Sequence, residues 1–443
     1  MVILRSYYKQ AFWFLSLALA LYVFCQADPL YTPTYDDTAI LMRYLVNFRT
    51  GHFLTYNIAD GPVYGVTDFW QGLATGVLSW LGLAPLASVM MVSFLFTVVF
   101  FYAVLRILHE ISDRAEFAIV AGAAFYFSSS FIAQTLFLGL ETPLHLFLVA
   151  TTFLLFFQKR QKLFHLLAVA TIISKLDACA LVAGLLILNL LRSWQEGEVK
   201  KTALTGLAFF LAPLLAWGLV ATLLFGSPIP ESFLAKFLFY PKAPRTSWFP
   251  FLEPMINAPL LLKSMLWAGG GCILAILVAV ARREWFSPSL VFVMAFAGTM
   301  ALYYLHDPLE KMSWYYSLPE FLLLMAVVCA PFDASRLRPW FLGVPATLVA
   351  VVVVAVVLDL RLPLNRVAIP ADRNWEMYYE AERIASGELA NRVAPKVRRV
   401  LWTGSGYAAY LFDGYVVDVS GLDFPQIWKV LERTRQPDQA TRD

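Results

Sequence analysis

The amino-acid sequence predicts an all-α polytopic membrane protein with a small α/β segment at its C-terminal end. Hydrophobic residues fill 60% of the 443 positions and charged residues only 15%, which leaves too few polar side chains to cover a water-soluble globule. Apolar runs close to the roughly 20 residues that cross a bilayer recur along the chain. Basic residues fall on every second short connection between these runs. We therefore expect a lipid bilayer to surround most of this chain.

The apolar runs predict about eleven transmembrane helices. The first run follows Arg5 and Lys9 but ends without a small-x-small cleavage site, so we interpret it as a retained span and not as a signal peptide. A charged turn separates two short runs near the middle of the chain. The predicted spans are 11–27, 85–108, 117–138, 141–157, 163–176, 178–192, 203–225, 264–281, 287–305, 316–331 and 339–358.

The basic connections set the predicted orientation. By the positive-inside rule they are cytoplasmic, which puts the N-terminus inside and, after an odd number of spans, the C-terminus outside. We expect a transmembrane domain over 1–358, with its first extracytoplasmic loop at 28–84, and a small extracytoplasmic domain over 359–443. The basic residues are Arg5, Lys9, Arg106, Arg114, Lys159, Arg160, Lys162, Arg192, Lys200, Lys201, Arg282, Arg283, Arg336 and Arg338.

Two segments outside the spans also have predicted structure. Residues 69–84 are apolar and rich in Trp, but too short and too often broken by Gly to cross alone, so we expect a helix lying in the membrane interface. Beyond Asp359 the composition becomes ordinary. A polar helix is predicted over about 372–390, followed by short alternating strands around 399–402 and 415–419.

Several function classes can be set aside from composition. The net charge is only +3 and no basic cluster interleaves with aromatic residues, which argues against nucleic-acid binding. The four cysteines sit in or beside apolar runs, which favours small buried side chains over disulfides or metal ligands. No His/Cys cluster indicates a metal site. A divalent cation held by carboxylates is left open.

Two adjacent acids, Asp36 and Asp37, follow the first span at the predicted outer boundary. Neighbouring residues on a helix point about 100° apart, so the pair cannot address one proton and must have separate roles. In the functional interpretation one carboxylate is the general base toward an acceptor hydroxyl, and the other orients it, caps a helix beginning at Thr38 or holds a metal. In the structural interpretation both acids lie in a solvated loop that caps a helix.

Further ionisable residues stand at the same predicted side of the membrane, where charge is costly and points to function. They are Glu141 and Asp177 among the acids and Lys175 and Lys236 among the bases. Acids and cations around one outer cleft suit displacement of a phosphate leaving group from a sugar, since a carboxylate takes the acceptor proton and a cation steadies the departing charge. The structural alternative is internal ion pairing of Lys175 with Asp177 or Glu141.

The order of these motifs resembles the bacterial GT-C-type membrane glycosyltransferases, and most closely the branch that contains the terminal arabinofuranosyltransferases of the mycobacterial envelope. Each motif is weak alone, but they occur in the family's order over most of the chain. The matching segments are Asp36-Asp37-Thr38-Ala39-Ile40, Arg43-Tyr44, Gly51-His52, Tyr56-Asn57, 64–70, Gly139-Leu140-Glu141-Thr142, 174–178, 225–236, and 403–423 with its Val417-Asp418-Val419-Ser420-Gly421-Leu422 run.

The resemblance implies a GT-C fold and inverting transfer from a polyprenyl-phosphate sugar to an envelope glycan, glycolipid or protein acceptor at the extracytoplasmic face of a bacterial plasma membrane. It implies Asp36 or Asp37 as catalytic base and a lipid-linked sugar as the donor substrate. No cofactor is assigned, and a divalent cation stays open. The remaining site residues that we assign on this basis are Lys175, Lys236 and Arg43 on the donor phosphate, and His52, Glu141, Asp177, Tyr315 and Tyr316 lining the pocket.

The sequence departs from the family pattern at several points. Lys175 stands where the family has Arg, which loses a bidentate grip on phosphate. Leu176 replaces a proline, and aromatics at 314–316 take the place of a late arginine. Two other classes stay open: a transporter or flippase of an amphiphilic substrate, for which no convincing internal repeat is found, and an inactive scaffold or lipid-glycan binding subunit.

Overall fold

The computed structural model is mostly helical, and its residues form two compact units. The first unit comprises residues 1–32, 93–214 and 242–370, and the second comprises 33–92, 215–241 and 371–443. The structure describes residues 2–27, 36–66, 68–128, 132, 135–238, 286–306, 317–335, 386–392, 399–402 and 406–418.

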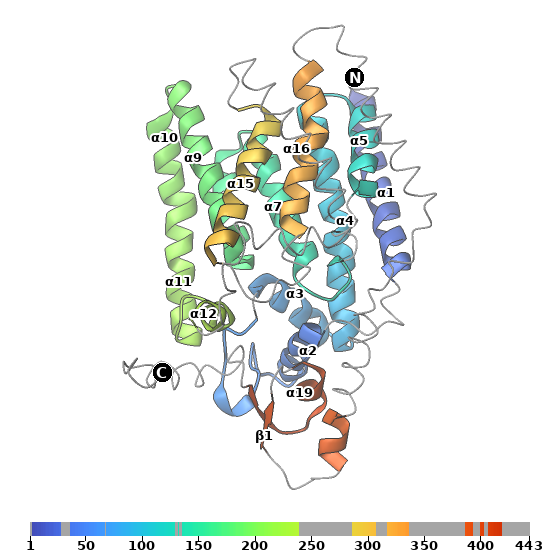
Figure 1. Ribbon diagram of the computed structural model, residues 1–443, viewed down its shortest axis with the longest axis vertical. Coiled ribbons are helices and arrows are strands. Elements are labelled where there is room, and N and C mark those ends of the chain that lie inside the picture. The colour runs from blue at the N-terminus through green and yellow to red at the C-terminus, as the bar shows by residue number, and fades with distance from the viewer. Residues whose placement is uncertain are drawn as a thin grey trace, which may run out of the picture. The chain divides into compact units, whose positions relative to one another are not determined.

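The first unit is a bundle of apolar helices that run side by side (Figure 1). The hairpin of α7 and α8 and the pair of α15 and α16 are its most extensive packings, and α15 also packs on α9. Its helices are α1 (Val2–Ala27), α4 (Pro85–Ser112, of which Ser93 onward belongs here), α5 (Ala115–Ser128), α7 (Thr142–Phe157), α8 (Gln161–Ser174), α9 (Cys179–Gln195), α10 (Val199–Gly206), α15 (Pro288–His306) and α16 (Ser317–Ser335).

Aromatic side chains fill the core of the bundle. The rings of Phe153 and Phe292 stack with centroids 4.4 Å apart, and Phe321 meets both edge-on or nearly so. Trp13 of α1 stacks on Tyr102 of α4 at 4.2 Å. Between helices in a lipid bilayer the hydrophobic effect contributes little, so dense packing has to hold the helices together. Large interlocking rings provide such packing.

Two buried acids in this unit serve the backbone of helices. Glu320 accepts a hydrogen bond from the N–H of Ile132 at 2.8 Å. Asp333 accepts from the N–H and the hydroxyl of Ser289, in the first turn of α15. These carboxylates therefore satisfy N–H groups that no apolar neighbour could pair, which accounts for acids inside apolar helices without a catalytic role.

A single long helix runs from Val199 to Phe225 through α10, a π-helical turn at Leu207–Leu211 and α11 (Ala212–Phe225). In the turn the N–H of Ala212 bonds to the carbonyl of Leu207, five residues earlier. Pro213 explains the wider turn, because a proline has no N–H to donate and its ring crowds the carbonyl one turn before it. A π-turn accommodates the proline without breaking the helix.

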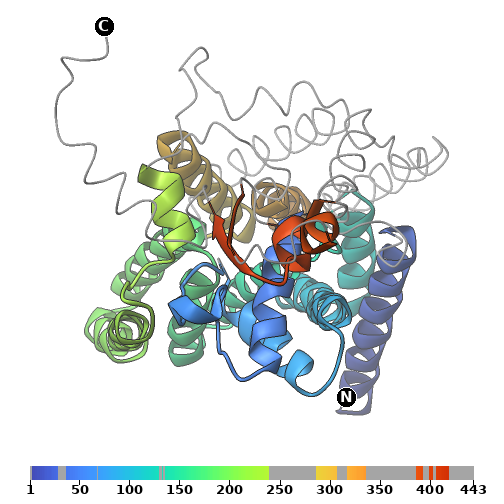
Figure 2. The same cartoon turned by 90° about the horizontal axis from the view of Figure 1, so that it is seen from below.

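The second unit joins the first loop to the C-terminal segment. Its elements are α2 (Asp36–Arg49), η1 (Ile58–Asp60), α3 (Phe69–Trp80), the first turns of α4, most of α11, α12 (Glu231–Leu238), β1 (Arg399–Trp402), α19 (Tyr407–Leu411) and β2 (Tyr415–Asp418). The strands pair in parallel with Arg399 opposite Tyr415. Figure 2 shows α19 beside α2, and the two helices are in contact.

The core of the second unit mixes residues from both ends of the chain. Tyr44 and Tyr56 pack against Phe412 and Val416, all of them buried. Helix α3 approaches α2 closely because Gly76 leaves room for the ring of Phe48. The first loop and the C-terminal strands therefore fold as one structure.

The helices confirm much of the predicted pattern, although not the number of spans. Helices occur at the predicted runs wherever the structure describes them, and a break separates the two short central ones at Lys175. Four of the described helices are long and apolar enough to cross a membrane: Tyr7–Cys25, Pro85–Ser112, Leu176–Gln195 and Val199–Phe225. The runs at 264–281 and 339–358, the predicted domain boundary at 358 and most of the helix over 372–390 lie outside the described residues.

The predicted strands and the helix after residue 68 are also present. The strands lie at Arg399–Trp402 and Tyr415–Asp418, and α3 occupies Phe69–Trp80 with Asp68 as its N-cap. The C-terminal strands share one unit with the first loop. That α3 lies in a membrane interface, and that the segment after residue 358 is extracytoplasmic, stay predictions.

Candidate functional site

In the first unit, the ends of α7 and α8 hold two of the predicted site residues together. Gly139 has a φ of +83°, a left-handed conformation that favours glycine, and it turns the chain into α7. Glu141 is the N-cap residue, and Pro143 lies in the first turn, where its missing N–H costs nothing. Glu141 is thereby fixed at the helix start.

Lys175 occupies the break between α8 and α9. It is the C-cap of α8, with an extended backbone (φ −154°, ψ 122°), and a short 3-10 turn, η2 (Leu176–Ala178), leads directly into α9. Its N–H bonds to the carbonyl of Thr171, and its own carbonyl accepts from Ala178. The near-loopless turn expected from the sequence is therefore confirmed, with one extended residue between helical segments.

Glu141 and Lys175 form an ion pair with an N···O distance of 2.8 Å. Their side chains are only 12% and 10% exposed. Each charge also suits its helix end, since an anion is stabilised at the N-terminus of α7 and a cation at the C-terminus of α8. The internal ion pairing that the sequence left open for Lys175 is thus present, with Glu141 as the partner.

His145 and Ser174 lie next to this ion pair, and the sequence analysis did not single them out. His145 follows Glu141 by one turn, is only 4% exposed, and its Nδ1 is 3.3 Å from Oγ of Ser174. Its Nε2 and Oδ2 of Asp177 are buried without a hydrogen-bond partner among the described residues. The i to i+4 spacing of Glu141 and His145 was the signal available in the sequence.

In the second unit, Asp36 and Asp37 open helix α2. Asp37 is half-buried and the following Thr38 is buried. A helix N-terminus stabilises negative charge through its free N–H groups and its dipole, which suits an acid in this first turn. Among the described residues the helix therefore begins at Asp36, two residues before the predicted start at Thr38, and both acids lie in its first turn instead of capping it.

Arg43, two turns further along α2, has its guanidinium directed at protein oxygens. The side chain is 9% exposed and stacks over the ring of Tyr56 at 5.0 Å. Its N–H groups make five hydrogen bonds, so the group that we expected on the donor phosphate holds the C-terminal segment instead. They go to the carbonyls of Tyr56 (3.0 Å), Ala409, Phe412 (3.2 Å) and Gly414 (2.7 Å) and to Oδ1 of Asn57 (3.2 Å).

Asn57 and Asp60 extend the same connection. The amide of Asn57 donates to the carbonyl of Val416 at 2.8 Å and accepts from its N–H at 3.1 Å, as a strand partner would. The hydroxyl of Tyr415 donates to Asp60 at 2.8 Å. Burial, followed by this bond and the charge of Asp60, raises the pKa of Tyr415 to about 12. The sequence analysis named Asn57 only as part of the Tyr56-Asn57 motif and gave it no role.

Tyr64 anchors another motif of the second unit. Its ring stacks on Phe225 at 4.9 Å, its carbonyl accepts from the N–H of Glu231, and its side chain is 3% exposed. Burial raises the pKa of Tyr64 to about 12, the Trp217 hydrogen bond opposes this and the charge of Asp68 adds to it. Segments 64–70 and 225–231, which the sequence treats as separate motifs, are thereby brought into contact.

The other predicted site residues are placed in part. The side chain of His52 is exposed, in the turn after α2. The side chains of Asp36 and Lys236, and the whole of Tyr315 and Tyr316, lie outside the described part. Among the described residues, no three His, Cys, Asp or Glu side chains come together as metal ligands.

No family model, curated protein or solved structure matches this chain. The interpretation of the site therefore depends on its residues and their geometry.

Proposed function

We propose that this protein is a membrane glycosyltransferase that moves a sugar from a polyprenyl-phosphate donor to a glycan, glycolipid or protein acceptor at the outer face of a bacterial plasma membrane. Its apolar helices are compatible with a bilayer, in which such a donor resides. The order of motifs resembling GT-C enzymes gives the reaction class. We prefer the hypothesis of an enzyme to that of a transporter because the candidate charged residues lie at helix ends.

The observation that carries the proposal is the fixed position of Lys175. Ionisable groups between apolar helices are expensive, which makes Lys175 a candidate functional group. Glu141 at 2.8 Å, the C-terminus of α8 and the extended backbone all restrain this cation. A restrained cation stabilises charge that develops on a leaving group without reorganising during the reaction.

In the proposed reaction, a carboxylate of the Asp36-Asp37 pair accepts the proton of the acceptor hydroxyl. The acceptor oxygen then forms a bond to the anomeric carbon while the bond from that carbon to the phosphate oxygen breaks. The electron pair leaves on the polyprenyl phosphate, whose added charge a cation neutralises. Lys175 of the first unit and Lys236 of the second unit are the candidates for this role. Arg43 takes no part in this step, because its N–H groups are directed at the C-terminal segment. Glu141 positions Lys175.

The test is transfer from radiolabelled polyprenyl-phosphate sugars to membrane glycan acceptors by the purified full-length chain, with and without a chelator. We expect Asp36→Asn or Asp37→Asn to lower turnover by about 100-fold or more while donor binding persists, because the base is lost. Asp413→Asn is the control, since this acid is exposed in the second unit. The chelator arm decides whether a divalent cation takes part.

A second comparison addresses the cation. Lys175→Met should lower turnover by about 100-fold, whereas Lys159→Met, which removes an exposed lysine paired with Glu196 at 2.6 Å at the other end of α8, should not. Donor binding without transfer to any acceptor would favour the hypothesis that the protein is an inactive lipid-glycan binding subunit. If no donor binds, and reconstituted vesicles instead move a substrate across the bilayer, the protein is a transporter.

A further inference from the structure

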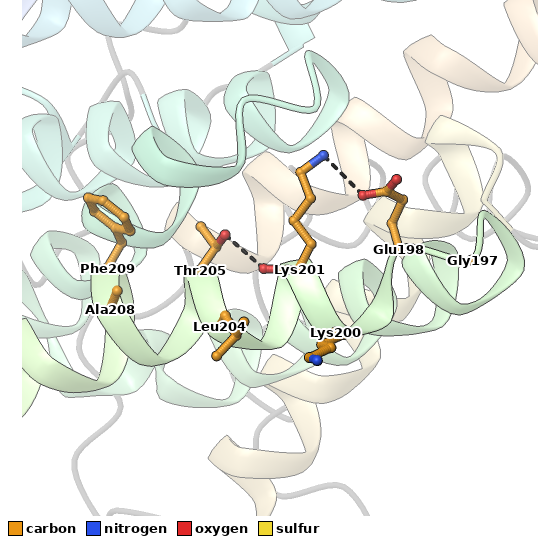
Figure 3. A pocket seen from close by; sticks show the side chains of 8 residues that line it. All are labelled: Gly197, Glu198, Lys200, Lys201, Leu204, Thr205, Ala208 and Phe209. Carbon is orange, nitrogen blue, oxygen red and sulfur yellow. Dashed lines mark hydrogen bonds and ion pairs between the residues drawn. The ribbon is translucent and has the colours of Figure 1, made fainter.

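A second candidate ligand site lies at the opposite end of α8 from Lys175. Here the first turns of α10 and the π-helical turn line an open depression of about 480 Å³ (Figure 3). It begins beside the turn that joins α9 to α10. Its lining residues are Gly197, Glu198, Lys200, Lys201, Leu204, Thr205, Ala208 and Phe209.

The helix that carries this depression is firmly held. The hydroxyls of Ser193 in α9 and Thr202 in α10 are 2.7 Å apart and buried. Gly206 faces the ring of His165 so closely that a β-carbon there would lie 3.3 Å from Nε2. The ammonium of Lys162 in α8 sits over the ring of Phe209 at 5.4 Å. The helix that carries the depression is therefore packed against α8 and α9.

The charge of the depression is mainly positive. Lys200 and Lys201 line it and Lys162 adjoins it through Phe209, against one acid, Glu198. Glu198 pairs with Lys201 at 3.0 Å, with side chains 52% and 79% exposed. An exposed pair of this kind is weak, so Lys201 can exchange Glu198 for a phosphate at little cost.

The same surface is apolar on one side and lies at the membrane boundary that the sequence predicts. Leu204, Leu207 and Leu211 are 57%, 55% and 41% exposed, which suits contact with lipid chains. Trp194, at the end of α9, is 71% exposed, and Trp is enriched where a helix leaves the bilayer. A ligand that is anionic at one end and apolar at the other would satisfy both halves.

We propose that this depression binds the phosphate headgroup of an anionic phospholipid from the leaflet that the basic residues predict to be cytoplasmic. Lys200 and Lys201 contact the phosphate, and the acyl chains lie along Leu204, Leu207 and Leu211. Basic pockets beside transmembrane helices on this side of a membrane bind such headgroups. The site is independent of the proposed sugar transfer.

Native mass spectrometry of the full-length protein in detergent tests this, with phosphatidylglycerol or phosphatidylcholine titrated in. We expect phosphatidylglycerol to be retained at least tenfold more tightly, and Lys200→Gln/Lys201→Gln to remove that preference. The control is Lys159→Gln/Arg160→Gln, which removes the same charge from exposed residues at this end of the bundle that do not line the depression. This variant should keep the preference for phosphatidylglycerol. Ala208→Trp, which fills the depression without changing charge, should weaken retention.

The outcomes distinguish a specific lipid site from general electrostatic attraction of anionic lipid to basic residues. Equal loss in the two double variants, or full retention by Lys200→Gln/Lys201→Gln and Ala208→Trp, would overturn the proposal. Inorganic phosphate is added in a further arm. If it displaces the lipid at the concentration at which it binds alone, the ligand is a free phosphate and the lipid assignment is wrong.

Discussion

At the scale of single residues, the ion pair of Glu141 and Lys175 allows a direct prediction on stability. Removing one partner leaves a poorly solvated charge, so Lys175→Met or Glu141→Gln should each lower the free energy of unfolding by about 3 kcal/mol. The double variant should lose less than the sum, because neither charge remains. Unfolding in detergent, followed for both singles and the double, measures this coupling.

The exposed pair of Lys159 and Glu196 is the matched control for this double-mutant cycle. Its side chains are 59% and 44% exposed, so the corresponding variants should change the free energy of unfolding by less than about 1 kcal/mol. Equal coupling in the two cycles would contradict the burial argument.

The raised pKa of Tyr64 predicts that the free energy of unfolding decreases at alkaline pH. Its pKa is raised to about 12 from 10.0, mainly by burial, so between these values the folded state keeps a proton that the unfolded state has lost. The stabilisation is complete below pH 10 and falls as pH rises through 12, by up to about 3 kcal/mol. Tyr64→Phe should flatten this part of the stability curve, measured from pH 8 to 12.

The exposed Tyr7, which is 64% accessible, supplies the control for that experiment. Tyr7→Phe should leave the curve of the wild type unchanged. A wild-type curve already flat between pH 10 and 12 would show that Tyr64 is not protected from solvent.

At the scale of elements, the packing of α2 on α3 depends on Gly76. A β-carbon there would lie 2.8 Å from the ring of Phe48, so Gly76→Ala should destabilise the protein by about 1 to 3 kcal/mol through overpacking. Because α2 carries Asp36 and Asp37, transfer activity should fall too. Thermal unfolding together with the transfer assay checks both effects.

Gly184 in α9 provides the opposite case. An added β-carbon there meets nothing within 4 Å, so Gly184→Ala should be neutral or stabilising by up to about 1 kcal/mol. Destabilisation by both alanines would mean that helix packing, as described, does not explain the effect at Gly76.

The elements themselves were largely predictable, and their details were not. Hydropathy located the helices around Lys175 because lipid exposure requires long apolar runs. The π-turn at Leu207–Leu211 could not be foreseen, since Pro213 is compatible with either a kink or a wide turn. The partner of Lys175 was left open between Glu141 and Asp177, because only the packing of α7 on α8 decides it.

At the scale of the whole molecule, Arg43 predicts a dependence of the first loop on the chain's end. Arg43→Met removes five hydrogen bonds and leaves buried carbonyls unpaired, which should cost about 3 kcal/mol or more in the second unit. The amide of Val416, which bonds to Asn57, should then exchange its hydrogen much faster. Hydrogen exchange followed by mass spectrometry measures this.

Arg49→Met is the control, because this residue is exposed at the end of α2. It should leave exchange at Val416 unchanged. The role of Arg43 was out of reach of sequence reasoning, which assigned it to phosphate by motif alone. Three of its acceptors are the carbonyls of Ala409, Phe412 and Gly414, which carry no residue-type signal and lie far along the chain.

That separation has a consequence for biogenesis. Arg43 meets Ala409 across 366 residues, which a ribosome adding about 5 to 20 residues per second supplies only some 20 to 70 s later. Closing so large a loop is also slow compared with forming helix hairpins. The nascent α2 is therefore made long before α19 and the residues that follow it, which carry the distant acceptors of Arg43. A chain stopped short of Ala409 would carry its helical hairpins and still lack these contacts, so the helix that bears the two aspartates gains its full set of partners only near the end of synthesis.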